Sequence, residues 1–291
     1  MMTISDSFQE LLRRIEPLQS EIDAAEGHIS TIRTRLTTAY NLRKFIRTGS
    51  YSRDTFIRGK SDVDMSAVVA RDDVRWGRGY VTSNTVLDNF KKELEGRFWN
   101  TTLYRDVQAI VVEFTDCRID VVPAFFERMT KENWPIYSMP DGAGGWMETS
   151  PELHNAYIKG EDNECGGKVK GTARLLKYWR ECREPRVPVS SFHIEMVLAS
   201  TGICRGVKSY ADCVTELLQN LAQRECRGLQ DPLGVSGIIP AVKTENQRES
   251  ALDSVKYSRD HAKKALSSIF WGNLQEARNQ WDIVFNGNFP W

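Results

Sequence analysis

Two aspartates in the first quarter of the chain have a spacing suited to metal binding. Asp62 and Asp64 are separated by Val63 and are followed by the mainly apolar residues 65–69, a composition typical of a β-strand. Because side chains alternate along a strand, both carboxylates should lie on one face. Mg²⁺ binds carboxylate oxygens together with substrate phosphates. The pair therefore predicts a magnesium site that acts on a phosphate-bearing substrate.

Two further features fit such a site. Gly49 and Ser50 form a small dipeptide that lets backbone N–H groups approach a phosphate. Asp120 lies in a mainly apolar strand candidate, where an unpaired charge would be costly. With this third carboxylate, two metal ions about 3.5–4 Å apart would clamp the attacking and leaving oxygens of a displacement. A lone D-x-D or G-S is common in loops, but the whole string predicts a nucleotide-handling metal site.

The elements that position these residues are of mixed type. Apolar patterning predicts a helix and three strands, at Thr85–Phe98, Val63–Val69, Val107–Phe114 and Arg118–Val122. The Gly- and Pro-containing stretch Tyr137–Trp146 is expected to be a loop that marks a domain boundary or crosses the active site. Beyond residue 150 the apolar spacing becomes helical. We therefore expect an α/β half followed by a helical half.

The first forty residues predict a long helix. Apolar residues recur every seven positions from Phe8 to Leu36, and a second series follows three residues after each. Such a heptad stripe serves either a coiled-coil dimer or a spine helix packed along its own protein. Pro17 should break or kink the helix. We prefer the spine, and with it a monomer.

Composition excludes several classes of protein. The 291 residues include 39 Lys and Arg and 39 Asp and Glu, so the formal net charge is zero, which argues against a broad basic face for long nucleic acid. The longest apolar runs, such as residues 121–126, are far shorter than the roughly twenty residues of a membrane span, and no signal peptide is visible. The six cysteines show no zinc-binding spacing, so we expect reduced thiols in a cytoplasmic protein.

These motifs resemble a known family. Gly49-Ser50, Ser61-Asp62-Val63-Asp64 and Asp120 are similar to the active-site signature of the DNA polymerase β-like nucleotidyltransferase superfamily. The longer string GSYSRDTFIRGKSDVD resembles the bacterial cGAS/DncV-like nucleotidyltransferases, or CD-NTases. In the helical half, LLKYW at residues 175–179 and SSFHIE at residues 190–195 are similar to the family's K-x-W and S-F-H-x-E segments.

The resemblance implies a fold and a reaction. The fold would be α+β, a polymerase β-like mixed sheet with a C-terminal helical lobe and a long N-terminal spine helix. Residues 1–145 would form the nucleotidyltransferase core with the spine helix, and residues 146–291 the helical lobe closing the nucleotide cleft. A ribose hydroxyl would attack the α-phosphate of an NTP, pyrophosphate would leave, and ring closure would give a cyclic di- or trinucleotide second messenger.

The resemblance also implies a setting for this reaction. Mg²⁺ would be the cofactor, with Mn²⁺ as its alternative, and ATP would be among the NTP substrates. The role would be anti-phage defence signalling (CBASS) in the cytoplasm, with regulatory protein partners. Animal relatives that sense DNA carry a Cys/His zinc insertion and a basic face, and the sequence shows neither. Activation by long double-stranded nucleic acid is therefore not expected.

The resemblance assigns roles to the residues of the first half. Asp62 and Asp64 would bind both metals, and Asp120 would complete the metal site and help to deprotonate the attacking hydroxyl. Gly49 and Ser50 would hold the donor triphosphate.

In the helical half, Lys177 would reach the triphosphate, Ser191 would add a phosphate contact and Phe192 would stack on a base. A lysine ammonium suits phosphate, and an aromatic face stacks on any base. Taken alone, however, Lys177 would be a solvated helix residue and Phe192 a core residue. Asn163 lies where an acceptor-base pocket would form, although Asn is also common in loops. His193 is expected to be a packing residue.

Two other functions stay open at this point. A linear template-independent RNA nucleotidyltransferase would share the metal site but need a basic track for its RNA. A non-catalytic nucleotide-sensing interaction module, joined through the heptad helix, would not need all three aspartates. Base identity, ring size and the 2′-5′ or 3′-5′ linkage depend on pocket shape, which these motifs do not encode.

Overall fold

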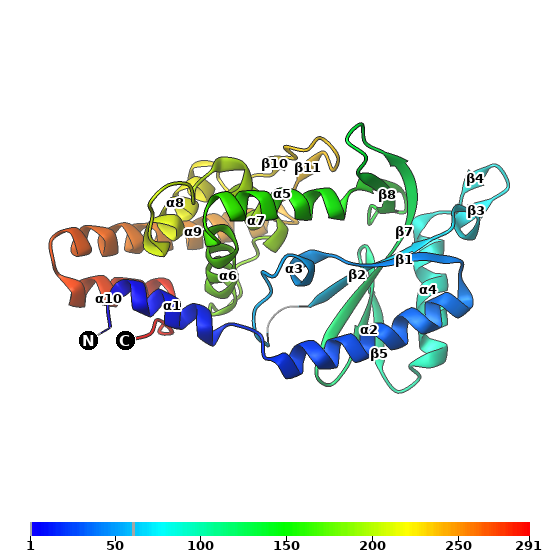
Figure 1. Ribbon diagram of the computed structural model, residues 1–291, viewed down its shortest axis with the longest axis horizontal. Coiled ribbons are helices and arrows are strands. Elements are labelled where there is room, and N and C mark those ends of the chain that lie inside the picture. Colours follow the sequence, from blue (N-terminus) through cyan, green and yellow to red (C-terminus); the bar gives the residue numbers. More distant parts are fainter. Residues whose placement is uncertain (1, 60–61) are drawn as a thin grey trace. The chain divides into compact units, whose positions relative to one another are not determined.

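The computed structural model describes residues 2–59 and 62–291, and the chain divides into two compact units. The sheet unit is Pro17–Ala156, and the helical unit combines Met1–Glu16 with Tyr157–Trp291. Figure 1 labels their helices and strands. Among the described residues, no helix combines the length and the apolar character needed to cross a membrane.

The sheet unit is built on a mixed sheet that, within the described residues, has seven strands in the order β1-β2-β7-β6-β5, with β8 paired to β7 and β9 to β8. Strands β2 and β7 run parallel, and the other neighbours pair antiparallel. The strands are β1 (Leu42–Arg47), β2 (Val63–Val69), β5 (Thr102–Asp106), β6 (Ala109–Glu113), β7 (Arg118–Met129), β8 (Pro135–Pro140) and β9 (Trp146–Thr149). A separate hairpin pairs β3 (Arg75–Trp76) with β4 (Gly79–Tyr80).

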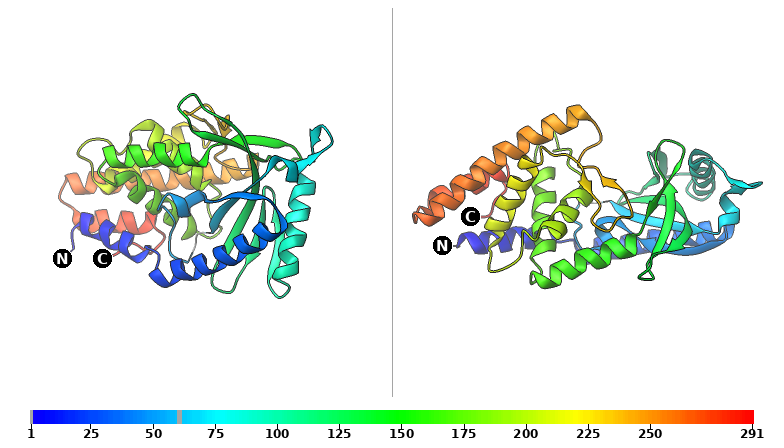
Figure 2. Two further views of the ribbon diagram at one scale, coloured as in Figure 1. Left: turned by 45° about the vertical axis from the view of Figure 1, so that its right-hand side comes forward. Right: turned by 90° about the horizontal axis from the view of Figure 1, so that it is seen from above.

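Helices α2 (Gln19–Ala39) and α4 (Ser83–Arg97) pack on one face of this sheet (Figure 1 and Figure 2). Leu36 of α2 and Phe90 of α4 belong to the same buried core as Met65 of β2 and Val121 of β7. Because strand side chains alternate, the residues next to Met65 and Val121 face away from the helices. Asp64 and Asp120 are two of these residues, so helix packing on one face leaves the carboxylates on the other.

The predicted strand at Val63–Val69 is confirmed, but the structure corrects the loop expected at Tyr137–Trp146. Tyr137 lies inside strand β8 and Trp146 begins strand β9, where it pairs with Pro140. Only residues 141–145 form the turn, and the Asp141 carboxylate accepts the N–H groups of Ala143 and Gly145. Pro140 stands at a strand end, a position where proline is tolerated in a sheet. The glycine and proline residues of the stretch 137–146 therefore mark a hairpin rather than a long loop.

The strand expected at Val107–Phe114 also begins later than predicted. Val107 has a positive φ of 48° and lies in the tight turn between β5 and β6, so β6 starts at Ala109. Strand β7, in contrast, continues past the predicted end at Val122 to Met129, because its later residues pair with β8.

The N-terminal spine consists of two helices separated at the break predicted for Pro17. Helix α1 (Ile4–Arg14) belongs to the helical unit and α2 to the sheet unit. Phe8 of α1 packs edge-on against Trp281 with ring centroids 4.9 Å apart, and Ile32 and Leu36 of α2 are fully buried in the sheet-unit core. The heptad stripe is therefore used for packing within the chain.

The rest of the helical unit contains six helices within the described residues, α5 (Pro151–Glu164, beginning in the sheet unit), α6 (Lys168–Glu181), α7 (Ser191–Thr201), α8 (Tyr210–Gln223), α9 (Glu245–Phe270) and α10 (Leu274–Val284), and the short strands β10 (Leu229–Gln230) and β11 (Ile238–Ile239). Trp179 is fully buried, and its ring N–H donates to Ser258 of α9 at 2.8 Å. All six cysteines of the chain are free thiols.

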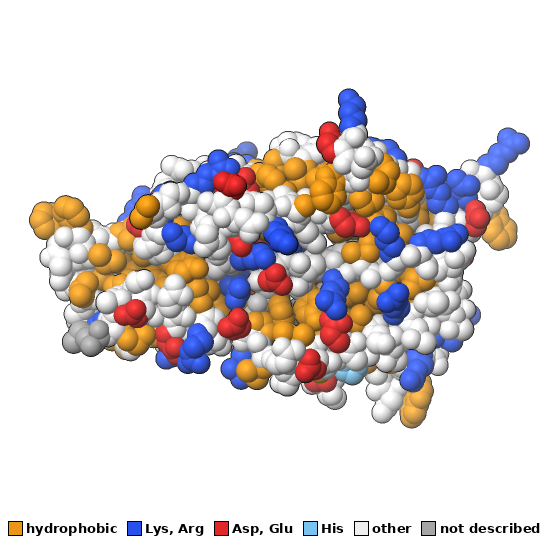
Figure 3. All heavy atoms as spheres, viewed as in Figure 1, with side chains coloured by type: hydrophobic (Ala, Val, Ile, Leu, Met, Phe, Trp, Pro, Cys, Tyr) orange, Lys and Arg blue, Asp and Glu red, His pale blue; other side chains and the backbone are white. Residues whose placement is uncertain are grey.

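The surface carries charges of both signs close together. On the face drawn in Figure 3, Lys and Arg side chains alternate with Asp and Glu side chains over the described residues. This face has no continuous basic surface of the kind that long nucleic acid requires.

Candidate active site

Four aspartates and one arginine share the sheet face that α2 and α4 leave uncovered. Asp64 of β2 and Asp120 of β7 are direct partners in the parallel register. Asp62 lies two residues before Asp64, on the same face by strand alternation. Asp106 ends strand β5, and Arg118 begins strand β7 two residues before Asp120. The three predicted carboxylates are therefore brought together, with two neighbours that sequence analysis did not identify.

Arg118 links these carboxylates. Its guanidinium donates to both oxygens of Asp120, from Nε at 2.9 Å and from Nη2 at 3.1 Å. The same group lies 3.7 Å from an oxygen of Asp62 and 3.6 Å from an oxygen of Asp106. Several carboxylates on one face repel one another unless a cation lies among them. The Arg118 guanidinium is one such positive group. The carboxylates offer only oxygen donors, which suit a hard divalent cation such as Mg²⁺.

Asp120 is less exposed than Asp62. Its side chain is 15% exposed, compared with 46% for Asp62. Burial raises the pKa of Asp120, and the hydrogen bond and charge of Arg118 act in the opposite direction. Burial opposes the charged form of Arg118, but its hydrogen bond to Asp120 and the nearby carboxylates raise its pKa overall. Arg118 therefore stays protonated beside Asp120.

The Gly49-Ser50 dipeptide lies directly against this cluster. It begins the short helix α3 (Gly49–Ser52), and Gly49 has a positive φ of 58°. A Cβ atom added at Gly49 would lie 1.7 Å from Oδ2 of Asp64, so only glycine lets the backbone approach the carboxylate this closely. The Thr48 N–H also donates to the backbone oxygen of Asp64 at 2.8 Å. The dipeptide and the metal-site candidates thus lie together in one site. Ser61, which also belongs to the sequence signature, lies outside the described residues.

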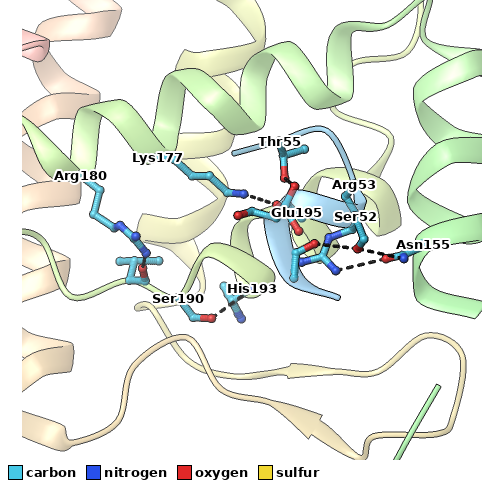
Figure 4. Close-up of polar contacts among 12 residues, drawn as sticks. Ser52, Arg53, Thr55, Asn155, Lys177, Arg180, Ser190, His193 and Glu195 are labelled. Atoms are coloured by element: carbon cyan, nitrogen blue, oxygen red, sulfur yellow. Dashed lines mark hydrogen bonds and ion pairs between the residues drawn. The ribbon is translucent and has the colours of Figure 1, made fainter. Parts of the chain in front are cut away.

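The loop after α3 is held by side-chain hydrogen bonds within the sheet unit (Figure 4). Asn155 donates from Nδ2 to the hydroxyl of Ser52 at 3.0 Å and accepts from the guanidinium of Arg53 at 3.2 Å. The Ser50 carbonyl accepts the N–H of Thr55 at 3.0 Å. These contacts fix the backbone that presents Gly49 and Ser50.

Lys177 is a buried residue of helix α6. It projects from α6 toward Glu195 of α7, and the two side chains form an ion pair (Figure 4). The side chains of Lys177 and Glu195 are 2% and 0% exposed, so the ammonium is not a solvated surface group. Because both charges are buried, removing only one of them would cost the other this ion-pair partner.

Ser191 and Phe192 begin helix α7, where both are half-buried. The preceding residue, Ser190, is the N-cap, and its hydroxyl accepts the N–H of His193 at 3.4 Å. Asn163 is exposed near the end of α5, and its backbone oxygen accepts the N–H of Gly166 at 3.1 Å. The predicted residues of the helical unit therefore lie on α5, α6 and the first turn of α7.

His193 is fully buried, and its Nδ1 lies 3.2 Å from the Ile239 carbonyl. Burial lowers its pKa to about 4, so the ring is neutral at pH 7. In this state Nδ1 carries the proton that the carbonyl accepts. The structure thus gives His193 the packing and hydrogen-bonding surroundings expected from the sequence.

Sequence comparison identifies the family of the chain. Residues 2–162, more than half of the chain, match the Second Messenger Oligonucleotide or Dinucleotide Synthetase (SMODS) domain family. The chain belongs to the SMODS family. This SMODS chain is 24% identical to a cyclic AMP-AMP-AMP synthase from Escherichia coli, over 98% of its own length and 92% of that protein. It is 21% identical to a probable cyclic nucleotide synthase from Bacillus cereus, over 86% of its own length and 83% of that protein.

Solved structures share its fold. The SMODS chain matches E. coli CdnC with ATP at a TM-score of 0.72 and 19% identity, over 98% of both chains. It matches the same protein in a complex with HORMA-deltaN at a TM-score of 0.70 and 20% identity, over 98% of its length and 96% of that chain. The predicted α+β fold and the CD-NTase assignment are confirmed. The SMODS chain is an enzyme, a nucleotidyltransferase of the cyclic-oligonucleotide-synthesising class.

Proposed function

We propose that this chain condenses NTPs into a cyclic di- or trinucleotide with the help of Mg²⁺ or Mn²⁺ held by Asp62, Asp64 and Asp120. The observation that carries this proposal is the alignment of Asp64 with Asp120 beside the backbone of Gly49. Carboxylates next to a backbone segment that suits a phosphate support the proposal, because carboxylate oxygens are ligands for a divalent cation.

The residues of the sheet unit would divide the work as follows. The bound metal would supply charge neutralisation at the triphosphate and activation of the attacking ribose hydroxyl. Asp120, whose pKa is raised by burial, would help to accept the proton of that hydroxyl. The backbone N–H groups of Gly49 and Ser50 would hold the donor triphosphate. Arg118 would keep Asp120 oriented through its two hydrogen bonds.

The helical unit would supply the remaining contacts. We propose that Ser191 contacts the triphosphate, that Phe192 stacks on a base and that Asn163 borders the acceptor-base pocket. Lys177 would also contact the triphosphate, but only after its buried ion pair with Glu195 opens. The half-buried positions of Ser191 and Phe192 at the first turn of α7 support this assignment, since such side chains keep part of their surface available to a ligand. In functional terms, residues 1–145 would be the catalytic core. Residues 146–291 would be the lobe that closes on the nucleotide.

The wider setting is also part of the proposal. ATP would be among the substrates, which the presence of ATP in the similar E. coli CdnC structure supports. A regulatory protein partner is supported by the HORMA-deltaN complex of that same protein. We propose a role in bacterial anti-phage defence of the CBASS type, carried out by a monomer in the cytoplasm, where NTPs are made.

The experiment is product analysis with mixed NTPs. The full chain is incubated with all four NTPs and Mg²⁺ or Mn²⁺, treated with phosphatase, and its products are identified by mass spectrometry. We expect a phosphatase-resistant cyclic oligonucleotide. The double variant Asp62→Asn/Asp64→Asn should give none, because neutral ligands hold the cation weakly. Asp88→Asn is the matched control, since Asp88 is an exposed α4 carboxylate paired with Arg105.

The outcomes separate the alternatives. An extended linear product would assign the chain to RNA nucleotidyl transfer. If no NTP is consumed, even after candidate protein partners are added, the result would favour a nucleotide-sensing module. Full turnover by the double variant at saturating Mg²⁺ would remove the metal assignment, whichever product is formed.

A further inference from the structure

Three metal-binding side chains converge at the edge of the sheet unit, outside the aspartate cluster. His28 comes from helix α2, and Asp116 and Cys117 come from the turn that joins β6 to β7. One donor atom of each residue lies within 4.8 Å of the donor atoms of the other two. Residues far apart in the sequence thus present nitrogen, oxygen and sulfur atoms to a single point.

Packing fixes these donors before any ligand binds. The His28 ring stacks on Phe114 with centroids 3.7 Å apart and planes at 15°. This stacking directs its Nε2 to Oδ1 of Asp116, 2.9 Å away. The turn itself is closed by the Phe114 N–H, which donates to the Cys117 carbonyl at 2.9 Å. Helix α2 and this turn both belong to the sheet unit.

The donor set selects a class of cation. Imidazole and thiolate suit Zn²⁺ and its analogue Co²⁺, whereas Mg²⁺ takes oxygen ligands. Three protein ligands leave a fourth position of a tetrahedral cation open to water. Asp116 and Cys117 also line a cavity of about 300 Å³, whose wall includes Asp62 and Arg118 of the aspartate cluster, and the fourth ligand would lie in this cavity.

We propose that His28, Asp116 and Cys117 bind one Zn²⁺-class cation that joins helix α2 to the start of strand β7. Such a cation would be held one residue away from Arg118, the residue that links the aspartate cluster. It would therefore stabilise the edge from which Arg118 projects. The cation would be separate from the oxygen-bound metal of the catalytic proposal, and the two sites differ in ligand chemistry.

The protonation of Cys117 defines how binding should respond to pH. Burial, together with the charge of Asp116, raises the pKa of Cys117 to about 11, so the residue is a thiol at neutral pH in the absence of a cation. A metal ion must displace this proton. Binding should release a proton and should strengthen as the pH rises.

The test uses Co²⁺ as a spectroscopic probe. The full chain is freed of metal with a chelator and titrated with Co²⁺ in excess Mg²⁺, which occupies oxygen-only sites. We expect a thiolate-to-Co²⁺ charge-transfer band in the near ultraviolet that saturates at one equivalent and disappears when Zn²⁺ is added. Cys117→Ser should lose the band. Cys182→Ser, the change of another half-buried free thiol, should keep it.

Two further measurements complete the design. His28→Gln should keep the thiol but weaken Co²⁺ binding at least tenfold. Zn²⁺ should raise the melting temperature of the wild-type chain and leave that of Cys117→Ser unchanged. The proposal would be overturned by the absence of a thiolate band in the wild-type chain, by its persistence in Cys117→Ser, or by undiminished affinity in His28→Gln. None of these readouts requires nucleotidyl transfer.

Discussion

Substituting Gly49 by alanine tests the close approach of backbone and carboxylate in the active site. The new Cβ would lie 1.7 Å from Oδ2 of Asp64, and ordinary van der Waals contact begins at 3.4 Å. The loop or the Asp64 side chain must therefore move by about 1.7 Å, the difference between these two distances. Gly59 offers a matched control in the same loop region. Its φ of 61° is nearly equal to that of Gly49, but a Cβ there meets no atom within 4 Å.

The two variants separate backbone strain from displacement of the carboxylate. An alanine in this left-handed conformation costs about 1–2 kcal/mol in both variants. Gly49→Ala should lose more stability than this, because its Cβ also displaces Asp64. Only Gly49→Ala should also move a metal-binding carboxylate. A misplacement on the order of 1 Å at a reacting centre costs about 100-fold in rate, or about 2.7 kcal/mol. We therefore expect kcat to fall about 100-fold in Gly49→Ala and to stay within about threefold in Gly59→Ala.

The assay is pyrophosphate release from the preferred NTPs, with the melting temperature of each variant measured in the same buffer. A loss of kcat confined to Gly49→Ala, with both variants folded at the assay temperature, would support the reasoning. Wild-type kcat in Gly49→Ala would refute it, because Asp64 would then tolerate displacement. An equal loss of kcat in Gly59→Ala would assign the effect to the loop backbone instead.

Four other changes test separate features of the structure. Lys177→Met leaves Glu195 buried without its cation and should cost about 3–5 kcal/mol of stability. Adding Glu195→Gln should restore the melting temperature but leave kcat/KM for NTP about ten- to a hundredfold lower, and recovery of both would limit the pair to a structural role. His193 has a pKa of about 4 in the fold, so only the unfolded chain gains its proton as the pH falls below 6.5. Denaturant unfolding should therefore show about 3 kcal/mol of stability lost between pH 6.5 and 4, and a flatter profile in His193→Gln; equal slopes would contradict the assignment. Ile29→Asp places a carboxylate in the core of the sheet unit and should lower the melting temperature. The mass measured by light scattering should not change. A wild-type dimer that this change dissociates into folded monomers would instead identify a coiled coil. Arg118→Met removes the cation among the aspartates. In chelator, the melting temperature of the variant should be lower than that of the wild-type chain, and Mg²⁺ should raise it by more. An equal response to Mg²⁺ would show that the guanidinium does not offset carboxylate repulsion.

Local patterns in the sequence were enough to predict which face of the strand the first two carboxylates share. The alternation of side chains along a strand depends only on neighbouring residues, so Asp62 and Asp64 could be placed on one face from their spacing. The strand at Val63–Val69 followed from the same pattern. The combination of Gly49-Ser50 with three aspartates was specific enough to indicate the superfamily, which the family match supports.

Local composition was less informative where long-range pairing decides the structure. Residues 137–146 contain the glycines and prolines of a loop, but their flanks form strands because β8 finds a partner in β7. Pro17 did separate two helices as expected. Which unit each of these helices joins depends on the residues that it meets, and Phe8 meets aromatic side chains from the far end of the chain.

The tertiary structure alone decided which distant residues share a site. Asp106 joins the aspartates because the antiparallel register of β5, β6 and β7 places it on their face, and no sequence spacing encodes that register. Lys177 is a buried ion-pair partner rather than a solvated residue because α7 supplies Glu195 opposite it. His28 meets Cys117 only when α2 packs on the sheet. Spacing along the chain determines which side of an element a residue occupies, whereas packing between elements determines what lies across from it.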